Sequence, residues 1–354
     1  MSVERANTLT AGWASVSPAG VFSAAVVYPL LALLATVAGG RAAEELRAVA
    51  PTPLKLPVRG ALGIWTREGT PLTLDWAARC DPRLTGDPAI DRPLLDAWAA
   101  AQTGAPVPPL PPIGPDDGLV LASALAVTAD WQEPFTDGVL RPADGPWAGR
   151  RLASLHRRGP DLSAVRVAHT PAGPVTLLTI AGTADVDVVL CTAGGAAPPG
   201  TVLAAAATAR PAGSSRPPSG PCISKGLVDA DDPEPELVVK VPRFAAVAAH
   251  DLLGLAKVLG LGAAVSAGTF PGVGPDPLRV TAAGQSVAAA FTGPGFRAAP
   301  VEPAPWAPAP VAAATARRLR VTVRFDSPFG HLTVHRPTGL VLMAGWVSDP
   351  EEAR

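Results

Sequence analysis

The sequence predicts an α+β protein with a large mixed or antiparallel β-sheet. Three observations support this fold class. Helix-like patterns gather in the first third of the chain, and strand-like patterns dominate the rest. Hydrophobic residues make up 48% of the 354 residues, which is enough for one extensive core. No internal repeat is visible, and the length permits one large domain or two smaller ones.

The first apolar segment has two interpretations. Residues 6–40 carry no charged side chain, so hydropathy alone permits a membrane span. Pro29 and the polar residues before it favour a buried helix that ends at Gly39–Gly40. The N-terminus lacks the basic and apolar regions of a signal peptide, so we expect a cytoplasmic protein, with export by another route left open.

The next elements alternate between helix and strand. Residues 42–50 predict a short amphipathic helix, and residues 61–66 predict a strand. Residues 90–104 predict a second helix, which Asp91 can cap and Gly104 can terminate. The apolar run 118–131 is too continuous for an exposed strand, so we expect a strand that is buried on both faces.

Strand patterns dominate the remainder, although one further helix is expected at residues 250–262. The low-complexity segment 193–220 is expected to be partly exposed. Short apolar runs bounded by Gly, Pro and Asp predict strands at 164–170, 174–182, 186–194, 318–325, 330–335 and 339–347.

Composition and motifs argue against several functions. The net charge of −1 offers no basic surface for nucleic acid. The three cysteines (Cys80, Cys191 and Cys222) have neither metal-ligand nor disulfide-framework spacing. No G-x-S-x-G, H-E-x-x-H, Walker or dinucleotide-binding motif occurs, and the five histidines are scattered. We therefore predict that the chain is not an enzyme and that it uses no cofactor or metal.

Five segments, in order, resemble the serpin family. The C-terminal segment "FDSPFGHLTVHRPTGLVLMAGWVSDP" is similar to the family's last two strands and the turn before them. "VLASALAVTADWQEPF" resembles the strand that ends in W-x-x-P-F, with Ser123 in place of the usual Asn. The other three segments are "VPRFAAVAAHDLLGLAKVLGLGAAV", "TFPGV" and "VSPAGVFSAAVVYPLLALLATVAGGRAAEEL". The composition suggests a GC-rich genome, so a bacterial serpin is expected.

The resemblance implies one domain over residues 1–354, with three β-sheets, about nine helices and an exposed reactive-centre loop. It also implies that the apolar helix is buried behind the main sheet rather than in a membrane. The alanine- and proline-rich tract at about 295–318 takes the place of that loop, which we call the bait loop. The region where the sheet opens is expected to contain Trp131, Ser17, Ser123 and Gln285.

In the family mechanism, a serine protease cleaves the bait loop, and the loop then inserts as a new strand in the central sheet. The hinge of the loop is expected at Gly295, Phe296, Ala298, Ala299, Pro300 and Glu302. Pro300 lacks a backbone donor for a central strand, and Glu302 brings a carboxylate to an inward position. The hinge therefore departs from what insertion requires.

Counting back from the final strands places the scissile bond near Arg317 and Arg318, which suits a trypsin-like protease. A solvated edge-strand face is an equally good interpretation of these arginines. Two functions remain open: a monomeric inhibitor of trypsin-like or subtilisin-like serine proteases, or a non-inhibitory binding or scaffold protein whose loop cannot insert.

Overall fold

Alternation of side chains along the strands produces three sheets around one main core. The structure is a computed structural model that describes residues 2–58, 60–103, 109–110, 118–171, 173–195, 197–209, 218–266, 268–297 and 316–353. Within these residues it contains seven α-helices, where about nine were expected. Residues 51–58, which carry three prolines, form no helix, because proline cannot donate the backbone bonds of a helix interior.

Five of these helices lie in the first third of the chain, and the last two are α6 (Pro199–Thr208) and α7 (Ala256–Leu259). The first five are α1 (Ser2–Val16), α2 (Ala24–Val37), α3 (Gly40–Val49), α4 (Leu74–Ala77) and α5 (Pro88–Thr103). Short 3₁₀ turns lie at Gly145–Trp147, Leu162–Ala164 and Leu253–Leu255.

The apolar segment near the N-terminus forms α2, most of whose side chains are buried against the sheets. Ser23 begins this helix by accepting a hydrogen bond from the Val26 amide through Oγ. In the described part of the chain, no helix is long and apolar enough to cross a membrane.

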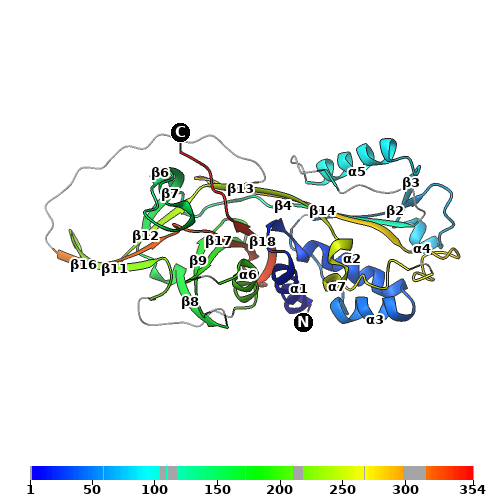
Figure 1. Cartoon of the computed structure of the whole chain (residues 1–354), viewed down its shortest axis with the longest axis horizontal. Helices are drawn as coiled ribbons and strands as arrows, with labels where there is room; N and C mark the ends of the chain where they lie inside the picture. Colours follow the sequence, from blue (N-terminus) through cyan, green and yellow to red (C-terminus); the bar gives the residue numbers. More distant parts are fainter. Residues whose placement is uncertain are drawn as a thin grey trace.

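A seven-stranded sheet runs through one half of the molecule. Helix α5 lies on one face of this sheet, and α1–α3 lie on the side of its opposite face (Figure 1). Its order is β3-β2-β4-β14-β15-β5, and β13 pairs with β14 as well. These strands are β2 (Gly60–Arg67), β3 (Asp81–Leu84), β4 (Leu119–Ala126), β5 (Ala129–Asp130), β13 (Phe244–Asp251), β14 (Val280–Phe291) and β15 (Gly295–Arg297).

A six-stranded sheet carries the C-terminal strands in the order β1-β18-β17-β10-β9-β8. A five-stranded sheet has the order β11-β16-β12-β7-β6. The first comprises β1 (Gly20–Phe22), β8 (Val165–Thr170), β9 (Gly173–Ala181), β10 (Val186–Ala193), β17 (Phe329–His335) and β18 (Leu340–Val347). The second comprises β6 (Thr136–Leu140), β7 (Leu152–Gly159), β11 (Ile223–Ala230), β12 (Glu236–Pro242) and β16 (Ala316–Arg324).

Strand β4 is buried on both faces, as its continuous apolar pattern predicted. Leu121 and Leu125 contribute to the main core, whereas Val120 and Ala124 pack in a second cluster with residues of α5. Side chains of a strand alternate between its faces, so an uncharged run of this kind suits a strand covered on both sides.

Two local predictions were wrong, and a third cannot be compared with the structure. Residues 250–262 do not form one helix: His250 and Asp251 end β13, and Gly260 adopts a left-handed conformation (φ 68°) that terminates α7 after one turn. Asp91 lies inside α5 rather than at its cap, and its carboxylate accepts from the amides of Thr85 and Gly86. Gly104, the expected end of that helix, lies outside the described residues.

The low-complexity segment contains a packed helix rather than only exposed chain. Alanine favours helix formation, and Val202 and Leu203 of α6 are fully buried in the main core. The expected C-terminal strands are confirmed as β16, β17 and β18.

Candidate functional site

The candidate site is the seam between β4 and β14 in the central sheet. The two strands pair directly and in parallel, from Val280 opposite Leu119 to Ala288 opposite Ala126. Beyond this stretch they separate, and β15 lies between β14 and β5. The described start of the bait loop thus already occupies the end of the seam, which we call the insertion slot.

A tight turn reverses the chain from β14 into the slot. The Thr292 amide and hydroxyl both donate to the Gly295 carbonyl, at 3.0 and 2.6 Å. The Trp131 amide donates to the Pro294 carbonyl at 3.1 Å, and the Trp131 indole donates to the Thr292 carbonyl at 2.8 Å. Backbone groups from both sides of the slot therefore fix the turn.

Gly295 is required here by close approach of two backbones. A Cβ at this position would overlap the Ala129 carbonyl oxygen and lie 3.0 Å from the Asp130 Cα. Because both contacts are with backbone, no side-chain rearrangement relieves them.

An aromatic cluster fills the interior below the turn. The ring of Phe291 lies 5.0 Å from Trp131 and stacks on Phe244 at 5.3 Å. Phe135 packs edge-on against Trp131 and Phe291, and the Arg157 guanidinium lies 4.8 Å from its ring centre. This packing fixes the position of Trp131 at the slot.

A buried polar cluster lies in the middle of the seam. Gln285 of β14 accepts from the Ser23 amide at 2.8 Å and donates to the Ser23 carbonyl at 2.8 Å. It also donates to the Ser123 hydroxyl of β4 at 3.2 Å, and Ser23 Oγ donates to the Leu342 carbonyl. These three polar residues join the two strands of the seam to the start of α2.

Sequence reasoning found two members of this cluster and missed the third. Ser123 and Gln285 lie together as expected, and Trp131 lies at the end of the same seam. Ser17 follows α1 and makes no bond with the cluster; Ser23 contacts Gln285 instead. The position of Ser23, directly before a long apolar run, marks it as a helix cap, but this local signal does not report its contact with Gln285.

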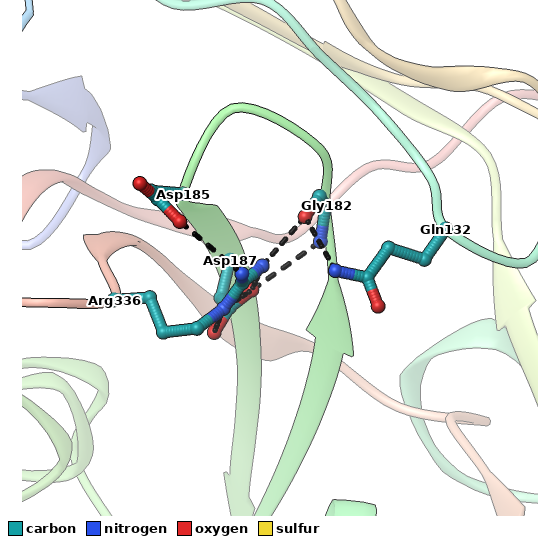
Figure 2. A network of polar contacts seen from close by, with 5 residues as sticks. All are labelled: Gln132, Gly182, Asp185, Asp187 and Arg336. Carbon is teal, nitrogen blue, oxygen red and sulfur yellow. Dashed lines mark hydrogen bonds and ion pairs between the residues drawn. The ribbon is translucent and has the colours of Figure 1, made fainter.

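A second polar network supports the far side of the slot (Figure 2). The Gln132 side-chain amide donates to the Gly182 carbonyl at 3.1 Å, and Thr183 donates to the Asp130 carbonyl at 2.7 Å. Arg336 donates to the Gly182 carbonyl at 2.5 Å and to the Asp187 carboxylate at 2.7 Å. The Asp187 carboxylate raises the pKa of Arg336.

Of the expected hinge, Gly295 and Phe296 belong to β15. The other hinge residues, Ala298, Ala299, Pro300 and Glu302, lie outside the described residues.

The expected scissile residues lie inside strand β16, so the strand begins before the expected loop end at 318. Arg317 is opposite Asp229 of β11, with 3.8 Å between Nε and Oδ1, and Arg318 binds Asp232 at 3.1 Å. From Ala316 to Leu319 the register pairs β16 with β11 only, and pairing with β12 starts at Arg320. A protease needs an extended, accessible substrate strand, so this bond is accessible only when the first residues of β16 separate from β11.

An open cavity of about 900 Å³ lies away from the seam. It is bordered by α1, the end of α6 and strands of the six-stranded sheet. Apolar side chains such as Leu177 and Leu332 line it together with Arg166 and Arg336. Its mixed lining suits a small amphipathic molecule.

No protein-family profile and no curated protein sequence matches the chain. Solved structures do. The chain is similar to protease nexin-1, solved with heparin (17% identity, TM-score 0.67, 99% of both chains). It is also similar to Serpin48 of the insect Tenebrio molitor (15%, TM-score 0.67, 98% of this chain and 97% of that one). A third match is thyroxine-binding globulin in complex with thyroxine (16%, TM-score 0.71, 99% of both chains). The fold predicted from the resemblance is therefore confirmed.

Proposed function

Because the chain has the serpin fold, we propose that it is a serpin-family inhibitor of serine proteases, whose cleaved bait loop inserts between β4 and β14. The observation that carries this proposal is the placement of β15. Residues 296 and 297 already pair with β14 on one side, and residues 295 and 296 with β5 on the other, in the direction that an inserted strand would follow.

The register of β15 defines where each later loop residue would go. Phe296 is opposite Phe291 and Ala129, and Ala288 of β14 is opposite Ala126 of β4. Continuing both pairings puts residue 299 between Ala288 and Ala126, so one added strand matches both edges of the seam. This agreement supports insertion in one specific register.

The same register identifies what opposes insertion. The Thr292 amide donates to the Gly295 carbonyl, so odd-numbered loop residues bond to β14 and even-numbered residues to β4. Pro300 would leave an acceptor on β4 without a donor, and Pro303 would do the same on β14. Each loss costs about 1–3 kcal/mol.

Glu302 would lie between Gln285 and Ser123, whose side chains face the interior. A carboxylate at this position meets a polar cluster rather than apolar side chains, and the Gln285 amide already donates there. Hydrogen bonds from such groups lower the cost of burying Glu302. Two prolines, rather than this carboxylate, are therefore the main barrier to deep insertion.

The direct test is incubation of the protein with trypsin and with subtilisin. A covalent complex that survives SDS, together with a rise in Tm of the cleaved protein, is the expected result for an inserting loop. Cleavage with no complex and no rise in Tm would overturn the proposal.

A double variant tests whether the two prolines are the barrier to loop insertion. P300A/P303A restores both donors, so it should raise the Tm gain after cleavage and the yield of complex with the protease. A substitution in the same loop that restores no donor, such as Ala304→Ser, should leave both unchanged.

The open cavity supports a second candidate, a non-inhibitory carrier of a small molecule. Thyroxine-binding globulin shows by its name that one structure with this fold carries a ligand. If the chain is a carrier, a fluorescent amphipathic dye such as anilinonaphthalene sulfonate should bind one site per protein, and V189W should abolish binding by filling the cavity. Dye binding that V189W leaves unchanged would reject the carrier.

A further inference from the structure

Among the strands that the structure describes, β11 forms the end of the five-stranded sheet and leaves one edge unpaired, which we call the free edge. It pairs with β16 from Ile223 to Ala230, and no strand of the described residues lies on its other side. With β16 it extends from the body at one end of the long axis (Figure 1). An exposed strand edge presents backbone donors and acceptors to another chain.

The register determines which residues of β11 present those groups. Arg324 donates to the Cys222 carbonyl at 2.9 Å, one step before the pair Ile223–Val323. Bonded pairs alternate along an antiparallel ladder, so Ser224, Gly226 and Val228 exchange bonds with β16. The amides and carbonyls of Lys225, Leu227 and Asp229 therefore point away from β16, toward the free edge.

The same three residues are self-complementary. Leu227 is 58% exposed, and it lies midway between a basic and an acidic side chain on the same face of the strand. When two copies of β11 run antiparallel with Leu227 opposite Leu227, each Lys225 faces an Asp229. If one strand is shifted by two residues relative to the other, Leu227 lies opposite Lys225 and both charge pairs are lost.

We propose that two copies of this chain associate through their β11 edges, antiparallel, about a two-fold axis at Leu227. The paired residues then supply backbone bonds, one apolar contact and two opposite-charge pairs. A homodimer with the same patch on both partners is the commonest form of assembly.

The proposed contact is short, which limits its strength. Stable interfaces bury about 1,200–2,000 Å² in total, and a few paired strand residues bury less. We therefore expect association only at concentrations of tens of micromolar or more (~10⁻⁵–10⁻⁴ M, in the range of weak, transient contacts). This departs from the monomer that the sequence predicts, and it is independent of the proposed inhibitory function.

The test is sedimentation velocity over roughly a hundredfold range of concentration, with two single charge variants and their mixture. K225D presents acidic side chains at both positions, and D229K presents basic side chains at both. Each variant alone should associate at least about tenfold more weakly than the wild type, because like charges then face each other. An equimolar mixture should associate again, because every acidic side chain then faces a basic one.

The mixture separates the proposal from general damage to the fold. Lys225 also donates to Ser219 Oγ and Asp229 contacts Arg317, so each variant is checked for an unchanged Tm. L227P is a second probe, because its lost N–H points to the free edge and not to β16. A wild type that stays monomeric, or a mixture that associates no better than its components, would overturn the proposal, as would an L227P protein that dimerises normally.

Discussion

Replacement of Gly295 by alanine tests whether the start of the bait loop lies in the insertion slot. The new Cβ would overlap the Ala129 carbonyl and approach the Asp130 Cα at 3.0 Å, so the chain must leave the slot. We expect β15 to lose its pairing with β5 and the turn from β14 to open.

The magnitude follows from the bonds that fix the turn. Two bonds to the Gly295 carbonyl and one to the Pro294 carbonyl are lost, and each contributes about 0.5–1.5 kcal/mol, so G295A should cost about 1.5–4.5 kcal/mol. The cost falls mainly on local opening, since the loop can detach without unfolding the sheets.

Urea unfolding and hydrogen exchange of the Thr292 and Trp131 amides measure the two effects. G293A is the matched control, because a Cβ there meets the Phe135 carbonyl at 3.4 Å, an ordinary contact. G295A should lower the free energy of unfolding and accelerate exchange at both amides, and G293A should do neither. If the two variants behave alike, the placement of β15 in the slot is refuted.

Three further predictions concern charged and titratable groups. D187N should lower stability by about 1–3 kcal/mol, because Asp187 is 8% exposed and accepts hydrogen bonds from Arg336, whereas D185N, which suits the left-handed backbone there, should cost under about 0.5 kcal/mol at its exposed site; equal Tm losses would contradict this. Burial lowers the pKa of His331 from 6.5 to about 4. The unfolded chain then binds a proton before the folded one, so this stability is full above pH 6.5 and falls by roughly 3 kcal/mol as pH drops to 4. H331Q should flatten that part of the pH–stability curve, and an unchanged slope would reject the assignment. R317S/R318S should abolish trypsin cleavage at residues 317–318 if the scissile bond lies there, and mass spectrometry of the fragments shows which bond is cut in the wild type.

The segments that the sequence predicted well are those whose pattern alone fixes their environment. The unbroken apolar run of β4 indicated burial on both faces, and the C-terminal strands followed from short apolar runs between turn residues. The helix at residues 250–262 failed because Gly254 and Gly260 interrupt its apolar stripe, and pairing of His250 with Gln285 extends β13 into it. Tertiary pairing of this kind overrides a local pattern.

The candidate site was predicted in part, for a similar reason. Gln285, Ser123 and Trp131 occupy positions in segments with recognisable patterns, so the resemblance located them. Ser23 was missed because its partner Gln285 is 262 residues away, and no local pattern reports that distance.

By itself, the sequence determined the α+β class and the order of the strands along the chain, because periodicity and turn residues act over a few neighbours. Only the tertiary structure decided the rest. It placed the loop's first residues between β14 and β5, paired Arg317 and Arg318 with β11, and left Leu227 on a free edge. These outcomes depend on strands far apart in the chain competing for the same edges, and that competition is resolved only when all of them pack together.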